Sequence, residues 1–339
     1  MIHDAFSCFC RAGWLALFLS MTNAHAATAV TWERLAPLPV GNGGFVSAVL
    51  GGDVLGGDVH IAGGTTWQGE TKLWLDQVWA YDARKNAWRD AGRLPAPLAY
   101  GVTGHDGRTW WIAGGSTGEK THQALWKIEA GKAAQRVAPL TGGVVYAAHA
   151  RIGARLYVVG GTDDQAAIDR VGSAFVAIDL ATGAITKLAN YPEAGLTTGT
   201  AAALGERMYV FGGARWDATD KKVVNHRSAH AYSVATNQWE KLAALPHPGR
   251  GYCAVALDDR HILVAGGYRN DEVEFVADAY LFDVMSRTYL PTKPLPYAGM
   301  VGLVQNGEWL YCIGGEDRKR HRTDAVFRIR WRELLASAR

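Results

Sequence analysis

Cysteine, proline and net charge are all scarce in this chain. It has 4 Cys and 11 Pro among 339 residues, and 35 Lys and Arg nearly balance 32 Asp and Glu, for a formal net charge of +3. The cysteines are too few for a disulfide framework. No block of like charges is long enough to track a phosphate backbone. The composition therefore argues against a disulfide-stapled fold and against a nucleic-acid partner.

Long apolar runs and the common metal and nucleotide motifs are also missing. No run of 18 apolar residues occurs, so no membrane-spanning helix is expected in the body of the chain. HExxH and CxxC motifs are absent, and a spacing of four in a strand-and-loop context does not put His226 and His230 on one face. Glycine pairs are frequent, but none precedes the helix start that a phosphate loop requires. We therefore expect no metal, nucleotide or other cofactor.

The first 26 residues are typical of a secretory signal peptide. An apolar run over residues 13–21 follows Arg11, and Ala24-His25-Ala26 has the form of a cleavage site. An uncleaved membrane anchor is the alternative. We predict a signal peptide over 1–26, export to the periplasm or the medium, and a mature chain free of the membrane that forms one domain over 27–339.

Two cysteines remain in that mature chain. Cys253 and Cys312 both lie inside apolar, strand-like runs. An exported compartment would permit one bond between them, but we expect two buried free thiols.

What the chain does have is glycine, 40 residues, and tryptophan, 13 residues. An apolar run ending in Gly-Gly recurs six times at intervals of about 50 residues. The pairs end at Gly64, Gly115, Gly161, Gly213, Gly267 and Gly315. A small-residue, β-prone segment precedes each run, a third strand follows it, and most units close with a fourth. This pattern resembles the kelch repeat, so we predict an all-β fold, a six-bladed kelch-type β-propeller.

The two ends of the chain complement each other. The sixth unit has no fourth strand after residues 324–331, whereas residues 31–39 have the form of a fourth strand with no unit before them. Pairing them removes an open sheet edge and closes the ring through contacts of maximal sequence separation. We predict that the N-terminal strand completes the last blade.

The sixth unit alone places a carboxylate directly after its glycine pair. Glu316 follows Gly315, and Arg322 lies six residues further on, just before Thr-Asp-Ala-Val-Phe; the other units have Thr, Ser, Thr, Ala or Tyr in the place of Glu316. This segment resembles the corresponding one of the bacterial kelch-repeat sialic acid mutarotases, also called N-acetylneuraminate epimerases. Its position in the last blade is that of the cyclically permuted branch of the family.

The resemblance implies an exported isomerase that interconverts the anomers of N-acetylneuraminate or a related acidic sugar. The family's proposed catalytic Glu and Arg fall on Glu316 and Arg322. Mutarotation requires a proton to leave the anomeric hydroxyl while the ring oxygen gains one, and a carboxylate can transfer protons in both directions. A guanidinium can hold a substrate carboxylate with two parallel hydrogen bonds. The expected partner is therefore a small, acidic sugar.

Two other interpretations stay open. Glu316 and Arg322 can form an ion pair on a solvated, charged loop, which contributes little. A kelch propeller can also be a non-catalytic module that binds glycan or protein.

Residues that start the first strands are expected to face a central channel and to contact the sugar. The substrate-binding candidates are Asn42, Tyr100, His149, Arg250 and Tyr252, together with Arg215 in the loop after a glycine pair. Arg250 is favoured, because this chain has Leu98 where the resembled family usually has an arginine.

Overall fold

The computed structural model describes Met1, residues 31–53 and residues 56–338. The chain divides into two units, Met1–Thr31 and Trp32–Arg339. The predicted signal peptide and residues 27–30 lie outside the described residues, apart from Met1. Among the helices that are described, none has the length and the apolar character needed to cross a membrane.

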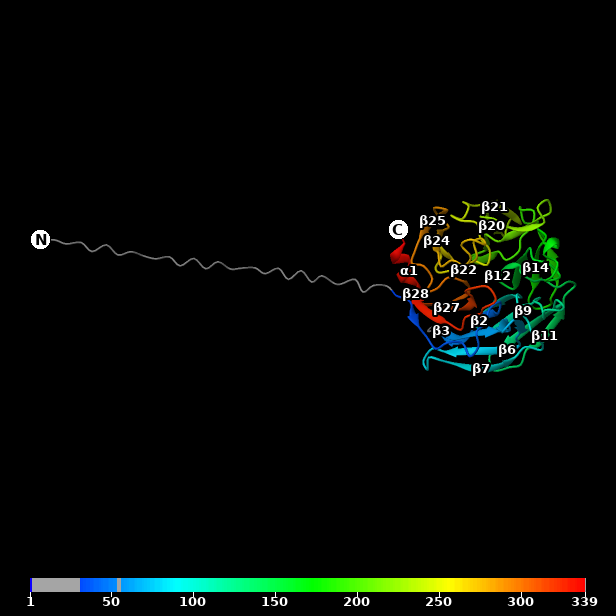
Figure 1. The fold of residues 1–339 in the computed structure, drawn as a ribbon, viewed down its shortest axis with the longest axis horizontal. Helices are drawn as coiled ribbons and strands as arrows, with labels where there is room; N and C mark the ends of the chain where they lie inside the picture. The colour runs from blue at the N-terminus through cyan, green and yellow to red at the C-terminus, as the bar shows by residue number, and fades with distance from the viewer. Residues whose placement is uncertain (2–30, 54–55, 339) are drawn as a thin grey trace. The chain divides into compact units, whose positions relative to one another are not determined.

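Six four-stranded sheets make up the Trp32–Arg339 unit, and every strand pair within them is antiparallel. The colours of Figure 1 follow the chain once around a ring of blades. The first strand of each blade lies near the centre and the fourth lies at the rim, as β2, β12 and β22 inside and β7, β11 and β21 outside show in Figure 1. The prediction of a six-bladed kelch-type β-propeller is confirmed.

The strands of the first three blades, from the centre outward, are β2 (Val46–Asp53), β3 (Gly56–Ala62), β6 (Gln77–Asp82) and β7 (Ala87–Arg93); β8 (Val102–His105), β9 (Thr109–Ala113), β10 (Ala124–Glu129) and β11 (Gln135–Pro139); β12 (Ala148–Ile152), β13 (Arg155–Val159), β14 (Phe175–Asp179) and β15 (Ile185–Lys187). Those of the last three are β16 (Thr200–Leu204), β17 (Arg207–Phe211), β20 (Ala229–Ser233) and β21 (Gln238–Lys241); β22 (Cys253–Ala256), β23 (His261–Ala265), β24 (Ala279–Asp283) and β25 (Thr288–Pro291); β26 (Met300–Asn306), β27 (Trp309–Glu316), β28 (Val326–Arg330) and β1 (Glu33–Arg34).

Two hairpins extend the loops that follow a glycine pair: β4 (Thr65–Gln68) with β5 (Thr71–Trp74), and β18 (Ala214–Asp217) with β19 (Lys222–Asn225). A 3-10 helix, η1 (Ile168–Arg170), and a C-terminal helix, α1 (Trp331–Ser337), complete the described elements.

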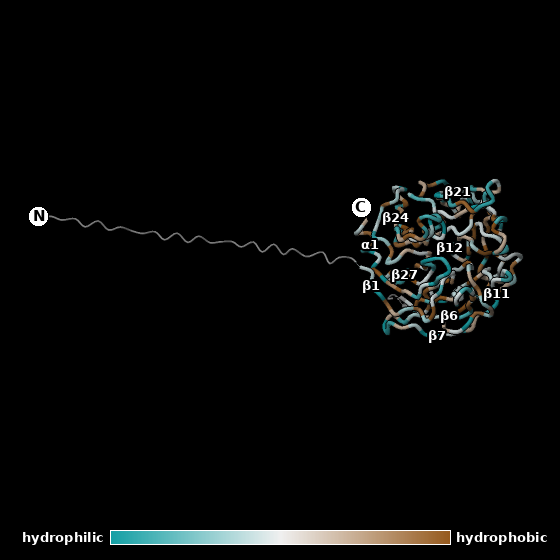
Figure 2. Tube along the Cα trace, viewed as in Figure 1, coloured by the Kyte–Doolittle hydropathy of each residue, from teal (hydrophilic) through white to brown (hydrophobic). Residues whose placement is uncertain are grey.

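The core lies in layers between neighbouring blades. Second strands are buried along almost their whole length, as in β13, β17 and β23, because both faces of each sheet meet an adjacent blade. Tyr157 and Phe175 of the third blade, for example, pack against Met208 and Tyr232 of the fourth. Figure 2 shows the apolar segments inside the ring and many polar segments in the outer loops.

The second glycine of each pair has a backbone conformation that other residues rarely adopt. Gly64 and Gly315 have φ of 98° and 102°. A Cβ at Gly64 would come within 2.0 Å of Asn42 Oδ1, and one at Gly315 within 2.2 Å of the Met300 carbonyl oxygen. Only glycine meets both requirements, which explains why the pairs recur.

The N-terminal strand closes the ring in the predicted way. β1 pairs with β28, with Glu33 opposite Arg328. The pairing continues beyond β1, because Leu35 N–H donates to the Val326 carbonyl at 2.9 Å and Leu38 N–H to that of Asp324 at 2.8 Å. The last blade is therefore built from both ends of the propeller.

Both cysteines of the propeller are free thiols. Burial raises the pKa of the Cys253 thiol to about 12 and that of the Cys312 thiol above its usual range. Both thiols therefore stay protonated and unreactive at neutral pH.

Candidate functional site

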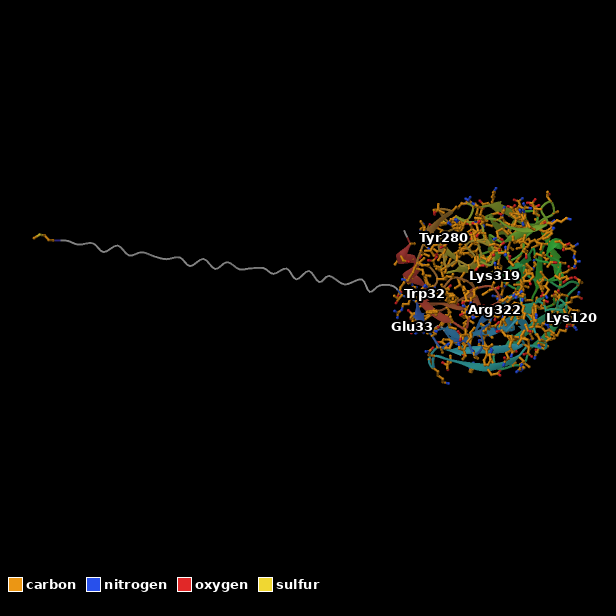
Figure 3. All side chains as sticks on the ribbon, in the orientation of Figure 1. Trp32, Glu33, Lys120, Tyr280, Lys319 and Arg322 are labelled. Carbon is orange, nitrogen blue, oxygen red and sulfur yellow. The ribbon has the colours of Figure 1, made fainter. Side chains whose placement is uncertain are left out.

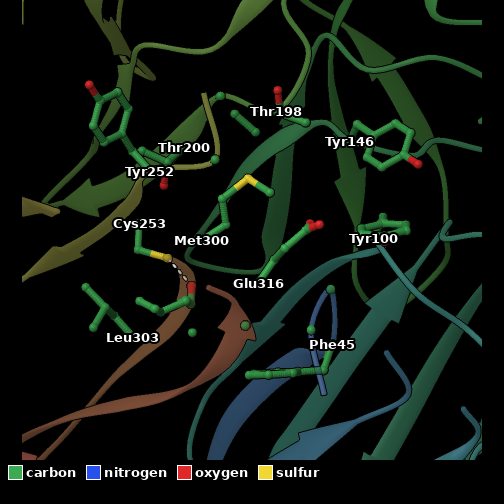
Figure 4. Close-up of a pocket in the computed structure, with 18 of the residues that line it drawn as sticks. Phe45, Tyr100, Tyr146, Thr198, Thr200, Tyr252, Cys253, Met300, Leu303 and Glu316 are labelled. Carbon is green, nitrogen blue, oxygen red and sulfur yellow. Dashed lines mark hydrogen bonds between the residues drawn. The ribbon is translucent and has the colours of Figure 1, made fainter. Parts of the chain in front are cut away.

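A cavity of about 560 Å³ lies at one mouth of the central channel, where the first strands begin. Figure 4 shows aromatic and small side chains around it, among them Phe45, Tyr100 and Tyr146, with the Glu316 carboxylate directed inward. Arg322 and Lys72 complete its charged lining. The cavity thus combines an apolar wall with a few charged groups, the usual character of a small-molecule site.

Five blades carry a left-handed residue at this mouth. Gly44, Tyr100, Tyr146, Thr198 and Gly251 have φ between 48° and 73°. Each is bonded to the next around the axis, since Tyr100 N–H donates to the Gly44 carbonyl at 2.8 Å, and the same bond recurs from Tyr146 to Tyr100, from Thr198 to Tyr146 and from Gly251 to Thr198. A left-handed conformation is unusual for tyrosine and more so for β-branched threonine. A belt of backbone hydrogen bonds therefore fixes these side chains around the mouth.

The belt is open at the sixth blade, because its first strand is one residue shorter there. Two residues lie between Ala99 and Val102, and two lie between their partners Ala113 and Ser116. In the sixth blade one residue lies between Met300 and Gly302, whereas two lie between their partners Ile313 and Glu316.

Glu316 pairs with Met300 in this shortened segment. The equivalent residues of the other blades are buried: Thr65, Ser116, Thr162, Ala214 and Tyr268. The Glu316 side chain is instead 21% exposed and lines the cavity.

Arg322 binds Glu316 directly. Its Nη1 lies 2.9 Å from Glu316 Oε2, and only 5% of the arginine side chain is exposed. Its Nε donates to Thr65 Oγ1 at 3.2 Å and its Nη2 to the Tyr100 hydroxyl at 3.4 Å. The two residues singled out by sequence are therefore an ion pair, but one held inside the cavity rather than on the solvated part of the loop.

The guanidinium has few donors left for a substrate. Nη1 also donates to the His321 carbonyl at 3.2 Å, so all three nitrogens are already bonded within the protein. Of five N–H groups, about one on Nη2 remains. In this arrangement Arg322 holds Glu316 and Tyr100 in place, and a two-pronged grip on a substrate carboxylate would require it to release a present partner.

Lys72 is a site residue that sequence reasoning missed. It lies in β5, its Nζ donates to the Tyr100 hydroxyl at 2.8 Å, and it sits 4.9 Å from the centroids of the Trp74 and Tyr100 rings. Such placement of a cation over aromatic faces is favourable. Its only signal in the sequence is a lysine between Trp67 and Trp74 in an extended loop.

The pKa values of Tyr100 and Tyr146 are shifted in opposite directions. Burial acts to raise the pKa of Tyr100, but the Lys72 ammonium and the Arg322 guanidinium outweigh it and lower that pKa below the ordinary tyrosine value. Burial raises the pKa of Tyr146, whose ring lies 4.7 Å from that of Tyr100. Tyr100 is thus the more acidic phenol of the pair.

His149 and Tyr252 also line the cavity. Burial lowers the pKa of His149 to about 4, so the imidazole is neutral at physiological pH. The Tyr252 hydroxyl donates to the His247 carbonyl at 3.2 Å and points away from the cavity in Figure 4, so this residue offers its ring edge rather than its hydroxyl.

Three further sequence candidates are not among the residues that line the cavity. Asn42 is buried, and its Nδ2 donates to the Gly63 carbonyl at 2.8 Å. Arg250 donates to Asn225 Oδ1 at 2.9 Å and stacks 4.4 Å from the Tyr268 centroid. Arg215 pairs with Asp217 at 3.4 Å within its own hairpin. Each already has a structural partner in its own part of the fold.

Leu98 does not face the channel either. Its side chain is buried in the core between the first two blades. The family that the sequence resembles usually has an arginine at this position, whereas in this protein the residue packs between blades.

A nucleophilic serine is not available at the one segment that has the G-x-S-x-G pattern, residues 114–118. Ser116 is fully buried and its Oγ accepts a hydrogen bond from the Gly118 N–H at 2.9 Å. Among the residues that the structure describes, no cluster of three His, Cys, Asp or Glu side chains could hold a metal ion.

The loop that carries Arg322 lies over the centre of the ring, where Figure 3 places Lys319 and Arg322. Lys319 pairs with Glu274 of the fifth blade at 3.0 Å, and Arg320 pairs with Glu70 in the first blade's hairpin. The loop thus bridges the two blades that flank its own.

Comparison with known proteins gives related but distant matches. The KLHDC2/KLHL20/DRC7 Kelch-repeats domain matches residues 141–294, which hold the third to fifth blades. Spermatocyte protein spe-26 of Caenorhabditis elegans is 22% identical over 245 residues, 71% of this chain and 34% of that protein. N-acetylneuraminate epimerase of Salmonella typhi is 24% identical over 161 residues, 38% of this chain and 42% of the epimerase. This chain therefore spans less than half the length of either relative.

The solved structure of YjhT has the same fold. It superposes with a TM-score of 0.67 at 17% identity and covers 79% of this chain and 89% of its own. The chain is a six-bladed kelch-type β-propeller with distant similarity to N-acetylneuraminate epimerase, to spermatocyte protein spe-26 and to a Kelch-repeats domain.

Proposed function

We propose that this protein is an exported sugar mutarotase that interconverts the anomers of N-acetylneuraminate or a related acidic sugar. The observation that carries the proposal is the Glu316–Arg322 pair inside the cavity at the channel mouth. The name of the Salmonella typhi relative, N-acetylneuraminate epimerase, supports the substrate class.

Glu316 is the proposed base. Its carboxylate borders the cavity at the gap in the belt, while Arg322 fixes its direction through the 2.9 Å contact. A sugar in the cavity could present its anomeric hydroxyl to the free carboxylate oxygen. General acid–base catalysis of this kind contributes roughly 10²–10⁴-fold to a rate.

The charge of the cavity favours an acidic sugar. The described residues that line it include two cations, Lys72 and Arg322, and one carboxylate, Glu316. His149 adds no charge at neutral pH because its pKa is about 4. A sugar carboxylate therefore enters a cavity with a net positive lining, which suits an anion.

The test is proton NMR of freshly prepared α-anomer with and without the protein. Glu316→Gln should lower the catalysed exchange rate by roughly 10²–10⁴-fold, because it removes the base and keeps the shape. Glu308→Gln, the same change at an exposed ion pair in the same blade, should leave the rate unchanged. Arg322→Lys should also lose rate, because a single ammonium cannot hold Thr65, Glu316 and Tyr100 together.

The competing function is a non-catalytic module that binds glycan or protein. Binding of the sugar by wild type with no acceleration of exchange for any reducing sugar would establish that reading and reject the mutarotase.

A further inference from the structure

The two cations that line the cavity, Lys72 and Arg322, both contact the phenol oxygen of Tyr100. Its oxygen accepts a hydrogen bond from Lys72 Nζ at 2.8 Å and one from Arg322 Nη2 at 3.4 Å. Thr65 Oγ1 lies 3.5 Å away, at the limit of a hydrogen bond, and its own proton goes to the Gly43 carbonyl at 3.1 Å. The phenolic proton thus has only a weak acceptor among these neighbours and is available to a ligand.

Tyr100 and Glu316 are bound to the two terminal nitrogens of the same guanidinium. Arg322 Nη1 contacts Glu316 Oε2 and Nη2 contacts the Tyr100 oxygen. Because these nitrogens belong to one rigid planar group, the carboxylate and the phenol are held side by side. Figure 4 shows the Glu316 carboxylate directed toward the two tyrosine rings.

We propose that Tyr100 is the second proton-transfer group of this site, the acid that acts opposite Glu316 on the ring oxygen of the sugar. This inference rests on the proposed mutarotase function and adds to it a residue and a role. The backbone supports it, because Tyr100 has φ of 60° and is held there by hydrogen bonds to Gly44 and Tyr146. These bonds fix the position of the Tyr100 ring at the channel mouth.

The step balances in protons and electrons. Glu316 takes the proton of the anomeric hydroxyl, the bond from the anomeric carbon to the ring oxygen breaks, and the ring oxygen takes its electrons and the phenolic proton of Tyr100. The sugar is then an open-chain carbonyl, with Glu316 neutral and Tyr100 a phenolate beside two cations. Rotation about the adjacent carbon–carbon bond and closure on the other face return both protons.

The charges around Tyr100 stabilise its phenolate form. The charged and titratable groups that face it are Lys72 on β5, Arg322 and Glu316 after and at the end of β27, and Tyr146 before β12. The two cations lower the pKa of Tyr100 against the opposing effect of burial, whereas burial raises that of Tyr146. Tyr146 is therefore a matched control, since it is the same residue with the same φ of 60° in the same cavity.

The test compares Tyr100→Phe with Tyr146→Phe in the NMR exchange assay across pH. Wild type should lose activity at high pH as the Tyr100 phenol ionises. Tyr100→Phe should lower kcat roughly 10²–10⁴-fold and remove this alkaline limb, although Lys72 remains present. Tyr146→Phe removes a phenol from the same cavity and should keep the alkaline limb, whatever its effect on kcat.

A second variant tests the pKa of the Tyr100 phenol by a measurement that does not depend on catalysis. Lys72→Met removes one of the two cations, so tyrosinate absorbance should show the phenol of Tyr100 ionising at higher pH, and the alkaline limb should move the same way. Lys72→Arg should restore both. The signal is assigned to Tyr100 by its loss in Tyr100→Phe.

The outcomes separate this inference from the function it rests on. If wild type accelerates exchange and Glu316→Gln does not, yet Tyr100→Phe keeps the wild-type rate and alkaline limb, the role of Tyr100 is wrong and the mutarotase stands. If wild type does not accelerate exchange, both are wrong.

Discussion

The backbone N–H of Tyr146 donates to the carbonyl of Tyr100 at 3.3 Å, and both residues have φ of 60°. This contact is one link of the belt that joins five successive blades around the channel mouth. Because the sixth blade is one residue short, the belt ends there and Glu316 borders the opening. The repeat thus supplies a rim of backbone hydrogen bonds, and the short sixth blade places Glu316, the proposed base, at its open end.

Relief of the strain in the belt should be measurable at Thr198. This β-branched residue has φ of 48°, which only glycine adopts without cost. We expect Thr198→Gly to raise the free energy of unfolding by about 1 kcal/mol, since a left-handed non-glycine residue costs roughly 1–3 kcal/mol and glycine loses part of that gain in the unfolded chain.

Thr200→Gly is the control for that change. Thr200 begins β16, where glycine is unfavourable. Denaturant unfolding should show opposite signs for the two variants, and an equal loss of stability in both would contradict the strain argument.

Closure of the ring depends on a few buried side chains of the N-terminal strand. Leu35 packs against Ile313 and Val326 of the last blade. Leu35→Ala should lower the free energy of unfolding by about 2–5 kcal/mol, the usual cost of such a truncation in a core. Leu73→Ala, in the exposed part of the β4–β5 hairpin, should change it little. Equal melting temperatures for the two variants would mean that the closing strand contributes nothing.

Acid sensitivity should reside partly in Asp283. Hydrogen bonds from Arg260, with Nε at 2.9 Å from Oδ1, and from the Met285 N–H hold the pKa of this buried carboxyl well below its usual range. Because the folded-state pKa lies below the unfolded value of about 4, the carboxylate stabilises the fold above that pH, and this contribution is lost as the pH falls below it. Asp283→Asn should therefore lower the melting temperature at pH 7, and the difference from wild type should shrink progressively below a pH of about 4.

Asp259→Asn is the matched change, because Asp259 is an exposed carboxylate in the turn beside Arg260. It should track wild type at every pH. A difference between Asp283→Asn and wild type that stayed constant from pH 7 to acid would refute the linkage to this carboxyl.

Much of the fold follows from local pattern. The glycine pairs, the strand alternation between them and the orphan fourth strand at residues 31–39 predict six blades and the closure of the last, and the structure has both. These features can be predicted from the sequence because each blade repeats the same local requirements. One such requirement is the φ of 102° at Gly315, which residues other than glycine rarely adopt. Glu316 is readable for the same reason, because it departs from a pattern that five other units keep.

The contacts of the other candidate residues could not be predicted from the sequence. The repeat pattern predicts which residues lie near the channel mouth, but it does not predict the direction of each side chain. Asn42 and Tyr252 precede first strands, and the Asn42 amide and the Tyr252 hydroxyl donate to backbone carbonyls within the fold. Arg250 turns to Asn225 and Tyr268. These choices depend on neighbouring blades, which no local pattern describes.

The sequence by itself determined the number of blades, the closing strand and the unusual carboxylate, because each is encoded within one repeat or at its boundary. Only the tertiary structure decided that Arg322 holds Tyr100, 222 residues away, and Thr65, 257 residues away, and that Lys72 shares the same phenol. Closing the ring brings the last blade beside the first, so residues that are far apart in the sequence come into contact across that junction. The acidity of Tyr100 and the direction of Glu316 arise at this junction, where the physical cause is proximity created by the closed ring.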